Sequence, residues 1–213
     1  MKVAIYDLDK TLVQRATFTP FLIFAARKIA PWRLVFLPLW LVAMLGYRAG
    51  LYDRTGLKTF GMRLIVGRKS PATLERIGRE FAAHHLARSG WMDGVVAMVE
   101  ADRRAGAHIA IATAAFAFYA RGFADRLGID TVIATDWDGS RIPGGNCYGA
   151  TKRDRVGAWL CDNGIAGEMR FVSDSFADAP LLDQADDAVF VTASPRTARR
   201  AQARGWRVVD GIG

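Results

Sequence analysis

Short apolar runs alternate with helical patterns over most of the chain. Six runs have the length and composition of buried strands: 2–6, 107–112, 131–135, 169–172, 188–192 and 206–209. Apolar residues recur with helical spacing in the segments between them: 92–104, 116–127, 152–163, a short stretch near 180, and 195–204. This alternation predicts an α/β protein built on a doubly wound parallel sheet.

One long stretch interrupts the alternation. About a hundred residues separate Leu12 from Thr113, far more than a single crossover helix requires. Their patterning is helical, with breaks at proline and glycine, over four segments: 18–29, 32–46, 51–66 and 71–88. We therefore expect residues 14–88 to form an all-helical cap subdomain inserted after the first strand. Residues 1–13 and 89–213 would form the core.

Composition fits one enzyme-sized unit. The 213 residues are 51% hydrophobic, enough to bury a full core. Cys147 and Cys161 have no metal-ligand spacing, which predicts a reducing compartment. The chain opens with a strand followed by two acids, so we expect no cleavable signal peptide and a cytoplasmic protein.

The positive charge is concentrated in the predicted cap. Residues 14–88 contain thirteen Lys or Arg against three acids, a net +10, whereas the whole chain carries +8. The chain lacks motifs that read or stack on nucleic acid, so we expect no specific nucleic-acid partner. Many of these charges suit a solvated helix surface. Their concentration also favours an anionic substrate or an anionic membrane surface.

Residues 34–46 are apolar on every face of a helix. Thirteen residues at about 1.5 Å each reach about 20 Å, short of the about 30 Å hydrocarbon core of a bilayer. The first interpretation is a buried cap helix. The alternative is an interfacial segment that makes peripheral contact with an anionic membrane, because bases flank it on both sides.

Candidate chemistry begins directly after the first strand, with Asp7 and Asp9. The end of a strand in an open α/β sheet is where ligands bind. Two such close carboxylates repel each other unless a cation or hydrogen-bond donors lie beside them, and oxygen ligands near a phosphate suggest Mg²⁺. An ordinary turn rich in aspartate is the alternative.

Three further segments carry chemistry at the end of a strand or the start of a helix. Thr113 and the backbone N–H groups that follow it, at Ala114, are suited to phosphate oxygens, although threonine is also an ordinary N-cap. Lys152 lies at the start of a helical pattern, and an ordinary solvated lysine is the alternative interpretation. Asp174 and Asp178 follow the strand at 169–172 and would otherwise begin a capped helix.

In this order, the segments resemble the four motifs of the haloacid dehalogenase-like superfamily of phosphohydrolases. The motif residues run from Asp7 to Asp178, nearly the whole chain. A helical cap at this position resembles the phosphoserine-phosphatase-like branch. The resemblance implies a Rossmann-like core and a Mg²⁺-dependent phosphatase that hydrolyses an anionic phosphomonoester.

The resemblance also implies a catalytic role for three residues. Asp7 would be the nucleophile that forms an aspartyl-phosphate. Asp9 would protonate the leaving alcohol and then deprotonate the attacking water. Lys152 would offset the charge of the transferring group.

The same resemblance implies the binding residues. Asp7, Asp174 and the backbone carbonyl of Asp9 would hold Mg²⁺, and Asp178 would join the metal set through a bound water or orient Lys152. Thr113, Ala114 and Lys152 would bind the substrate phosphate.

Substrate identity stays open at this point. Residues 31–33 ahead of the leucine-rich stretch, together with 173–182, are similar to a subgroup that includes bacterial phosphatidylglycerophosphatase C. This looser similarity implies a lipid phosphate cleaved at a membrane surface. Phosphotransfer to an alcohol and a non-catalytic anion-binding role also stay open.

Overall fold

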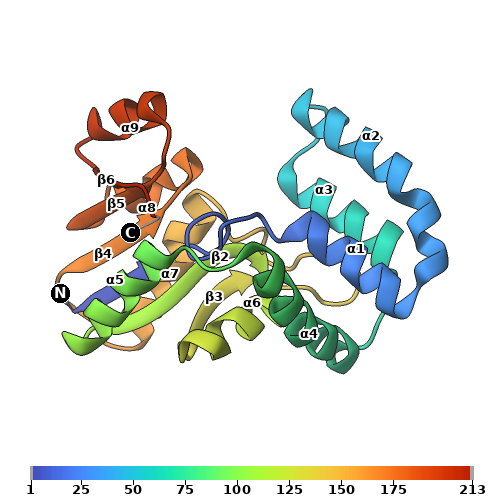
Figure 1. Ribbon diagram of the computed structural model, residues 1–213, viewed down its shortest axis with the longest axis horizontal. Coiled ribbons are helices and arrows are strands. Elements are labelled where there is room, and N and C mark those ends of the chain that lie inside the picture. The colour runs from blue at the N-terminus through green and yellow to red at the C-terminus, as the bar shows by residue number, and fades with distance from the viewer. Residues whose placement is uncertain (1, 212–213) are drawn as a thin grey trace.

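The computed structural model describes residues 2–211 and has a six-stranded sheet at its centre (Figure 1). The strands are β1 Val3–Tyr6, β2 His108–Phe116, β3 Thr131–Thr135, β4 Met169–Ser173, β5 Asp187–Val191 and β6 Arg207–Val209. Their order is β3-β2-β1-β4-β5-β6, and every neighbouring pair is parallel. The α/β fold class expected from the sequence is confirmed.

Helices cover both faces of the sheet. The core helices are α5 Asp93–Arg104, α6 Ala117–Ala124, α7 Ala150–Asp162, α8 Ala179–Leu182 and α9 Pro195–Gln202, with short 3-10 turns at Asp125–Leu127 and Phe176–Asp178. Ala4 and Tyr6 of β1 belong to the hydrophobic cluster that includes α5 and α6, whereas Val3 and Ile5 belong to the cluster with α7, α8 and α9. Side chains alternate across a strand, so β1 is buried from both sides.

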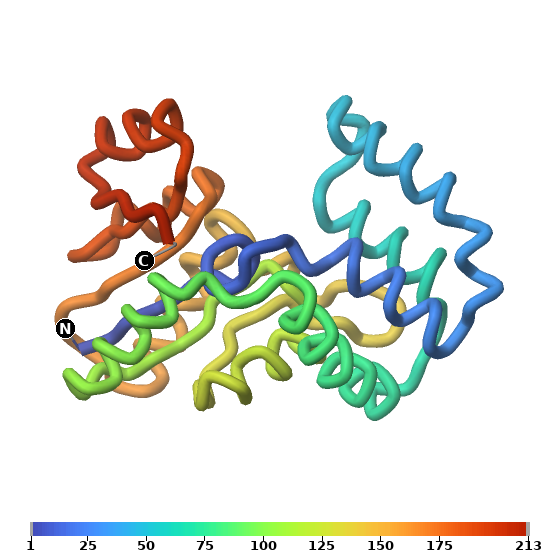
Figure 2. Tube along the Cα trace, viewed as in Figure 1, coloured from blue at the N-terminus to red at the C-terminus, as the bar shows by residue number. Residues whose placement is uncertain are grey.

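A helical insertion lies between β1 and β2 and extends to one side of the sheet (Figures 1 and 2). It consists of α1 Phe18–Ile29, a 3-10 turn Pro31–Phe36, α2 Leu37–Arg48, α3 Arg54–Gly61, a π-helical turn Met62–Val66 and α4 Pro71–Ser89. An inserted helical unit was expected here. The exact domain boundaries at residues 14 and 88 stay a prediction.

Two helices of the insertion are shorter than their patterns predicted. Proline at the start of segment 31–36 fixes a tight 3-10 turn, and a second proline, Pro38, lies in the first turn of α2. Asp53 caps α3 by accepting the backbone N–H of Gly56 at 2.7 Å, so this helix begins at Arg54 and not at residue 51. The N-cap and the prolines, and not the apolar periodicity, therefore determine where these helices begin.

The environment of α2 contradicts the interpretation of residues 34–46 as a buried helix. Trp40 is its one buried residue, while Leu41, Val42 and Leu45 are 55%, 61% and 63% exposed. A helix that is apolar all round buries only the stripe that faces its neighbours, and the outer stripe of α2 meets no other part of residues 2–211. Among these residues no helix is both long and apolar enough to cross a bilayer.

The insertion is fixed to the core by close packing of α4 on α6. A Cβ atom on Gly78 would lie 2.1 Å from the carbonyl oxygen of Phe118, so only glycine allows this approach. The rings of Phe21 and Tyr119 stack with centroids 4.8 Å apart across the same junction. This packing holds the first helix of the insertion beside the carboxyl ends of the strands.

Candidate active site

The candidate site lies where the strand order reverses, between β1 and β4. Asp7 follows β1 and Asp174 follows β4, so both acids leave the carboxyl edge of neighbouring parallel strands. The backbone N–H of Asp7 donates to the Val172 carbonyl at 2.9 Å. The Thr11 hydroxyl accepts the backbone N–H of Asp174 at 3.1 Å, which ties the two loops together.

Lys152 joins two of the acids. It lies in the first turn of α7, and its Nζ donates to Asp7 Oδ1 at 2.9 Å and to Asp178 Oδ2 at 2.6 Å. All three side chains are buried. The Ser173 hydroxyl donates to the same Asp178 oxygen at 2.8 Å, so the serine in this position contributes directly to holding Asp178.

A cavity of about 200 Å³ opens beside this bridge. Its lining includes every site residue expected from the sequence: Asp7, Asp9, Thr113, Ala114, Lys152, Asp174 and Asp178. The structure therefore brings together residues from four separate parts of the chain. Their individual roles stay predictions.

Thr113 lies inside β2, which continues four residues beyond the expected strand end at 112. The register with β3 shifts between Ala112 and Phe116, so the strand departs from regular pairing at this point. The Thr113 hydroxyl accepts the backbone N–H of Ala115 at 3.1 Å. Thr113 is therefore not the N-cap of a helix, which was the alternative interpretation, and this irregular strand segment places it in the lining of the cavity.

Asp9 is positioned by a tight turn after β1. Lys10, the next residue, has φ of 56°, a left-handed conformation that is uncommon for a residue other than glycine. Asp9 Oδ1 accepts the backbone N–H of Thr17 at 2.9 Å, immediately before α1. This carboxylate is therefore connected to the start of the helical insertion.

The site carries more negative than positive charge. Burial raises the pKa of Asp7 to about 7; Lys152 opposes this change, and the nearby carboxylates Asp178, Asp174 and Asp9 add to it. Burial also raises the pKa of Asp174 to about 6. Burial by itself would lower the pKa of Lys152, but Asp7 and Asp178 outweigh it and raise that pKa. One buried ammonium does not offset this group of carboxylates, so a further cation would stabilise their ionised forms.

The residues present fit Mg²⁺. Within residues 2–211, no three His, Cys, Asp or Glu side chains converge as a complete metal-ligand cluster. Mg²⁺, however, is usually held by one or two carboxylates together with waters and substrate phosphate, and Asp7 and Asp174 provide two. Asp178 Oδ1 is buried and accepts no hydrogen bond in the described part of the chain, so it suits a metal-bound water.

The structure adds cationic and aromatic groups that the motifs did not reveal. Arg54 and Tyr148 line the same cavity, and the guanidinium lies 4.4 Å from the centroid of the tyrosine ring. Lys58 is buried and donates to the Ala114 carbonyl and, at 2.9 Å, to Asn146 Oδ1. The spacing of Arg54 and Lys58, four residues apart on one helix, was the available sequence signal.

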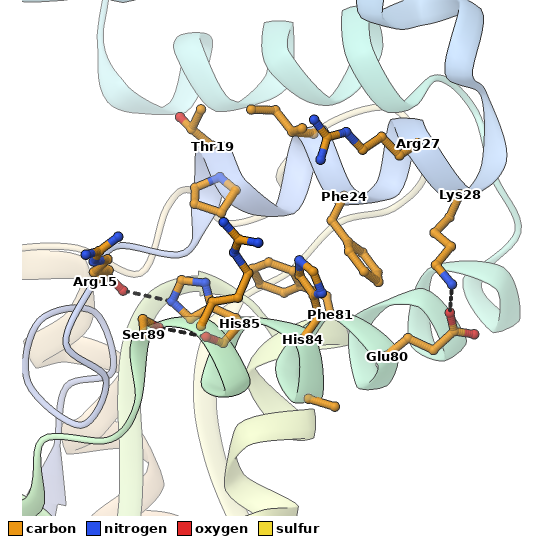
Figure 3. A pocket seen from close by; sticks show the side chains of 14 residues that line it. Arg15, Thr19, Phe24, Arg27, Lys28, Glu80, Phe81, His84, His85 and Ser89 are labelled. Carbon is orange, nitrogen blue, oxygen red and sulfur yellow. Dashed lines mark hydrogen bonds and ion pairs between the residues drawn. The ribbon is translucent and has the colours of Figure 1, made fainter.

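A larger groove of about 790 Å³ lies between α1 and α4 (Figure 3). It contains none of the motif residues. Its one carboxylate, Glu80, forms ion pairs with Arg76 at 2.6 Å and Lys28 at 3.5 Å. With a single carboxylate in its described lining, this groove lacks the neighbouring acids that the candidate site provides, despite its size.

Many solved structures resemble this chain, and three of them illustrate the range of similarity. A Bordetella pertussis Tohama I protein of unknown function is 29% identical, with a TM-score of 0.85 over 99% of this chain and 98% of that one. A phosphoserine phosphohydrolase-like protein from Francisella tularensis subsp. tularensis SCHU S4 is 18% identical, with a TM-score of 0.63 over 98% and 95%. A phosphoserine phosphatase in a phospho-aspartyl intermediate analogue form is 15% identical, with a TM-score of 0.61 over 98% and 93%. None of the curated proteins compared with the chain matches it.

Residues 4–183 match the haloacid dehalogenase-like hydrolase family. This range begins within β1, ends just after α8 and contains every residue of the candidate site. The fold is close to that of phosphoserine phosphatase-like proteins, whereas the looser similarity to phosphatidylglycerophosphatase C stays a prediction. The chain belongs to the haloacid dehalogenase-like hydrolase family.

Proposed function

We propose that the protein is a Mg²⁺-dependent phosphatase that hydrolyses a phosphomonoester through an aspartyl-phosphate on Asp7. The observation that carries the proposal is the buried bridge from Lys152 to Asp7 and Asp178. It lies in a cavity that Asp9 and Thr113 also line. A nucleophile, an acid–base group and a fixed cation thus share one small space.

The reaction has two steps, formation of the aspartyl-phosphate and its hydrolysis. An Asp7 carboxylate oxygen attacks phosphorus, the ester oxygen leaves, and Asp9 gives that oxygen its proton. Water then attacks the aspartyl-phosphate, Asp9 takes the proton from this water, and phosphate leaves with Asp7 restored. Lys152 remains charged throughout and offsets the negative charge of the transferring group. Mg²⁺, when bound at Asp7 and Asp174, would supply further positive charge for the phosphoryl oxygens.

The direct test is phosphate release from a panel of soluble phosphomonoesters, with Mg²⁺ and with a chelator. We expect release that requires Mg²⁺ and stops when the chelator is added. Glycerol in the same reaction tests phosphotransfer, because a transferase would form glycerol phosphate. Release that the chelator does not affect, or no release from any ester, would reject the proposal.

Replacing Asp174 with Asn should weaken Mg²⁺ activation. The change removes one of the two proposed carboxylate ligands at almost constant volume. Loss of a residue that only hydrogen-bonds to a metal ligand already lowers metal affinity by about 10- to 100-fold. Loss of a ligand itself should therefore raise the Mg²⁺ concentration for half-activation at least about tenfold. Asp162→Asn is the control, since Asp162 is exposed at the end of α7. Superimposable Mg²⁺ titrations for the two variants would remove Asp174 from the metal site.

A second candidate function is hydrolysis of a lipid-borne phosphate at an anionic membrane surface. All large hydrophobic side chains that are exposed in residues 2–211 fall between Trp32 and Phe60. The chain has no acid between Asp9 and Asp53, whereas Arg33 and Arg48 flank α2. An apolar face with basic flanks fits an anionic bilayer, because the apolar side chains can be buried among the lipids while the arginines are attracted to the negative headgroups.

Replacing Leu41, Val42 and Leu45 with Gln tests that membrane contact. If the substrate is lipid-borne, wild-type protein sediments with anionic vesicles at low salt, and the triple variant does not. The variant should also lose most activity on lipid phosphate in vesicles but keep its activity on a soluble ester, because these side chains are already exposed. Wild-type protein that stays in the supernatant would contradict the candidate. A concentration-dependent dimer that the variant abolishes would show that a second copy covers this face.

A further inference from the structure

A second cavity of about 430 Å³ lies between the helical insertion and the core. Asp9, Lys10, Arg54 and Ala114 line both this cavity and the one that contains Asp7. A group esterified to a phosphate beside Asp7 can therefore extend into the second cavity. The volume lies within the usual range for small-molecule pockets.

The walls of this cavity are largely apolar. They come from α1, α2, α3 and the segment after Thr113, and their apolar side chains include Phe18, Trp40, Met44, Leu57 and Tyr119. Trp40 is the one buried residue of α2. The inner stripe of this helix thus faces the cavity, while its outer stripe is exposed. A leaving group with an apolar part would be stabilised here, because its own apolar surface and that of the cavity wall would both be removed from water.

The charged groups of the cavity are nearly all positive. Lys10, Arg48, Arg54 and Lys58 line it, and Asp9 is the one carboxylate that residues 2–211 contribute. Arg54 is half-buried and forms no ion pair with any carboxylate of residues 2–211. Burial lowers the pKa of the nearby Lys58 to about 7, and the charge of Arg54 acts in the same direction. Asp9 offsets only part of the repulsion between Arg54 and Lys58, which a bound anion would reduce further.

We propose that this cavity receives the leaving group, and that the substrate is a phosphomonoester whose leaving group has an apolar part and a second negative charge, but no ammonium. Arg54 binds the second negative charge and is the specificity-determining residue. The inference rests on the proposed phosphatase function and deepens it by naming a substrate class.

The exclusion of an ammonium group follows from where the acids of the insertion lie. Asp53 caps α3, and Glu80 forms ion pairs with Arg76 and Lys28. Glu75, the third, is exposed and lines a different pocket. An amine beside the ester would therefore meet Arg54 and Lys58 with no acid of the insertion to pair with. The one carboxylate it could reach in the described part of this cavity is Asp9, whose proposed role is to carry the proton of the reaction. Phosphoserine carries such an amine, so we expect it to be a poor substrate even though phosphoserine phosphatases share this fold.

Two matched pairs of soluble esters test the proposal. Phosphoserine and 3-phosphonooxypropanoate differ only in the ammonium; phenyl phosphate and 4-carboxyphenyl phosphate differ only in the carboxylate. We expect kcat/KM to rise at least about tenfold when the carboxylate is added, since a hydrogen bond to a charged group commonly contributes that much. Removal of the ammonium should raise kcat/KM by a similar factor, because it ends the repulsion from Arg54 and Lys58. Equal or better hydrolysis of phosphoserine than of its partner would overturn the proposal.

The Arg54→Gln variant assigns the carboxylate preference to one residue. It should reduce the ratio of kcat/KM for 4-carboxyphenyl phosphate over phenyl phosphate to near unity. Arg79→Gln, which removes an exposed charge from α4, is the matched control and should leave the ratio unchanged. An unchanged ratio in Arg54→Gln, or an equal fall in the control, would remove Arg54 from the specificity role.

A binding measurement on protein that does not turn over distinguishes a wrong substrate class from a wrong catalytic function. The same four esters are titrated calorimetrically into the Asp7→Asn protein, which retains the cavity. If wild-type protein hydrolyses neither these four esters nor any other of the panel, the phosphatase function fails, and the order of binding affinities still decides the cavity's preference. An ester of this class can be soluble or lipid-borne; the vesicle assay separates these sources, because only the lipid-borne ester requires the outer face of α2.

Discussion

The Asp7→Asn protein is expected to lose phosphate release by at least about a thousandfold, the scale on which removal of a nucleophile acts. The amide cannot form the covalent intermediate. Thermal stability should stay equal or rise, because Lys152 keeps its ion pair with Asp178 and the change removes one of four clustered carboxylates at nearly constant volume. Phosphate release and the thermal unfolding midpoint measure the two effects.

Trapping of the aspartyl-phosphate tests directly whether Asp7 is the nucleophile. Acid quenching of the wild-type reaction followed by peptide mass spectrometry should locate a phosphate on the peptide that contains Asp7, and the variant should show none. Asp162→Asn is again the matched control, with normal release and normal trapping expected. Near-normal turnover by Asp7→Asn would exclude the covalent mechanism, whereas a label on another aspartate would relocate the nucleophile.

Replacing Lys152 with Ala should remove both activity and much of the stability. Lys152 is buried and is the shared ion-pair partner of Asp7 and Asp178. Removing one partner of a buried pair leaves an uncompensated charge, which costs about 3–5 kcal/mol. Arg153→Ala is the neighbouring control; its exposed pair with Asp154 should contribute no more than about 1 kcal/mol. Denaturant unfolding measures both free energies.

A double variant distinguishes the loss of charge balance from the loss of packing. Adding Asp178→Asn to Lys152→Ala removes one of the two carboxylates that lost its partner. We expect part of the stability to return, with no return of activity, since the charge that offsets the transferring group is still missing. If the two changes destabilise additively, packing of the lysine side chain is the main cause.

Several features of this protein follow from its sequence. Strand and helix patterns alternate, and Asp7, Thr113, Lys152 and Asp174 each lie near the end of a strand or the start of a helix. The carboxyl ends of parallel strands meet at one edge of the sheet, so these residues had to converge once the sheet formed. The fold class and the group of candidate site residues were therefore predictable.

Other features depended on contacts between elements, which the pattern of a single element does not report. The apolar run in α2 is the same sequence whether buried or exposed, and only the positions of α1 and α3 decided which stripe is covered. Arg54 and Lys58 resemble ordinary basic surface residues until α3 packs over the core. Periodicity specifies which side of a helix is apolar, whereas tertiary packing determines what that side meets.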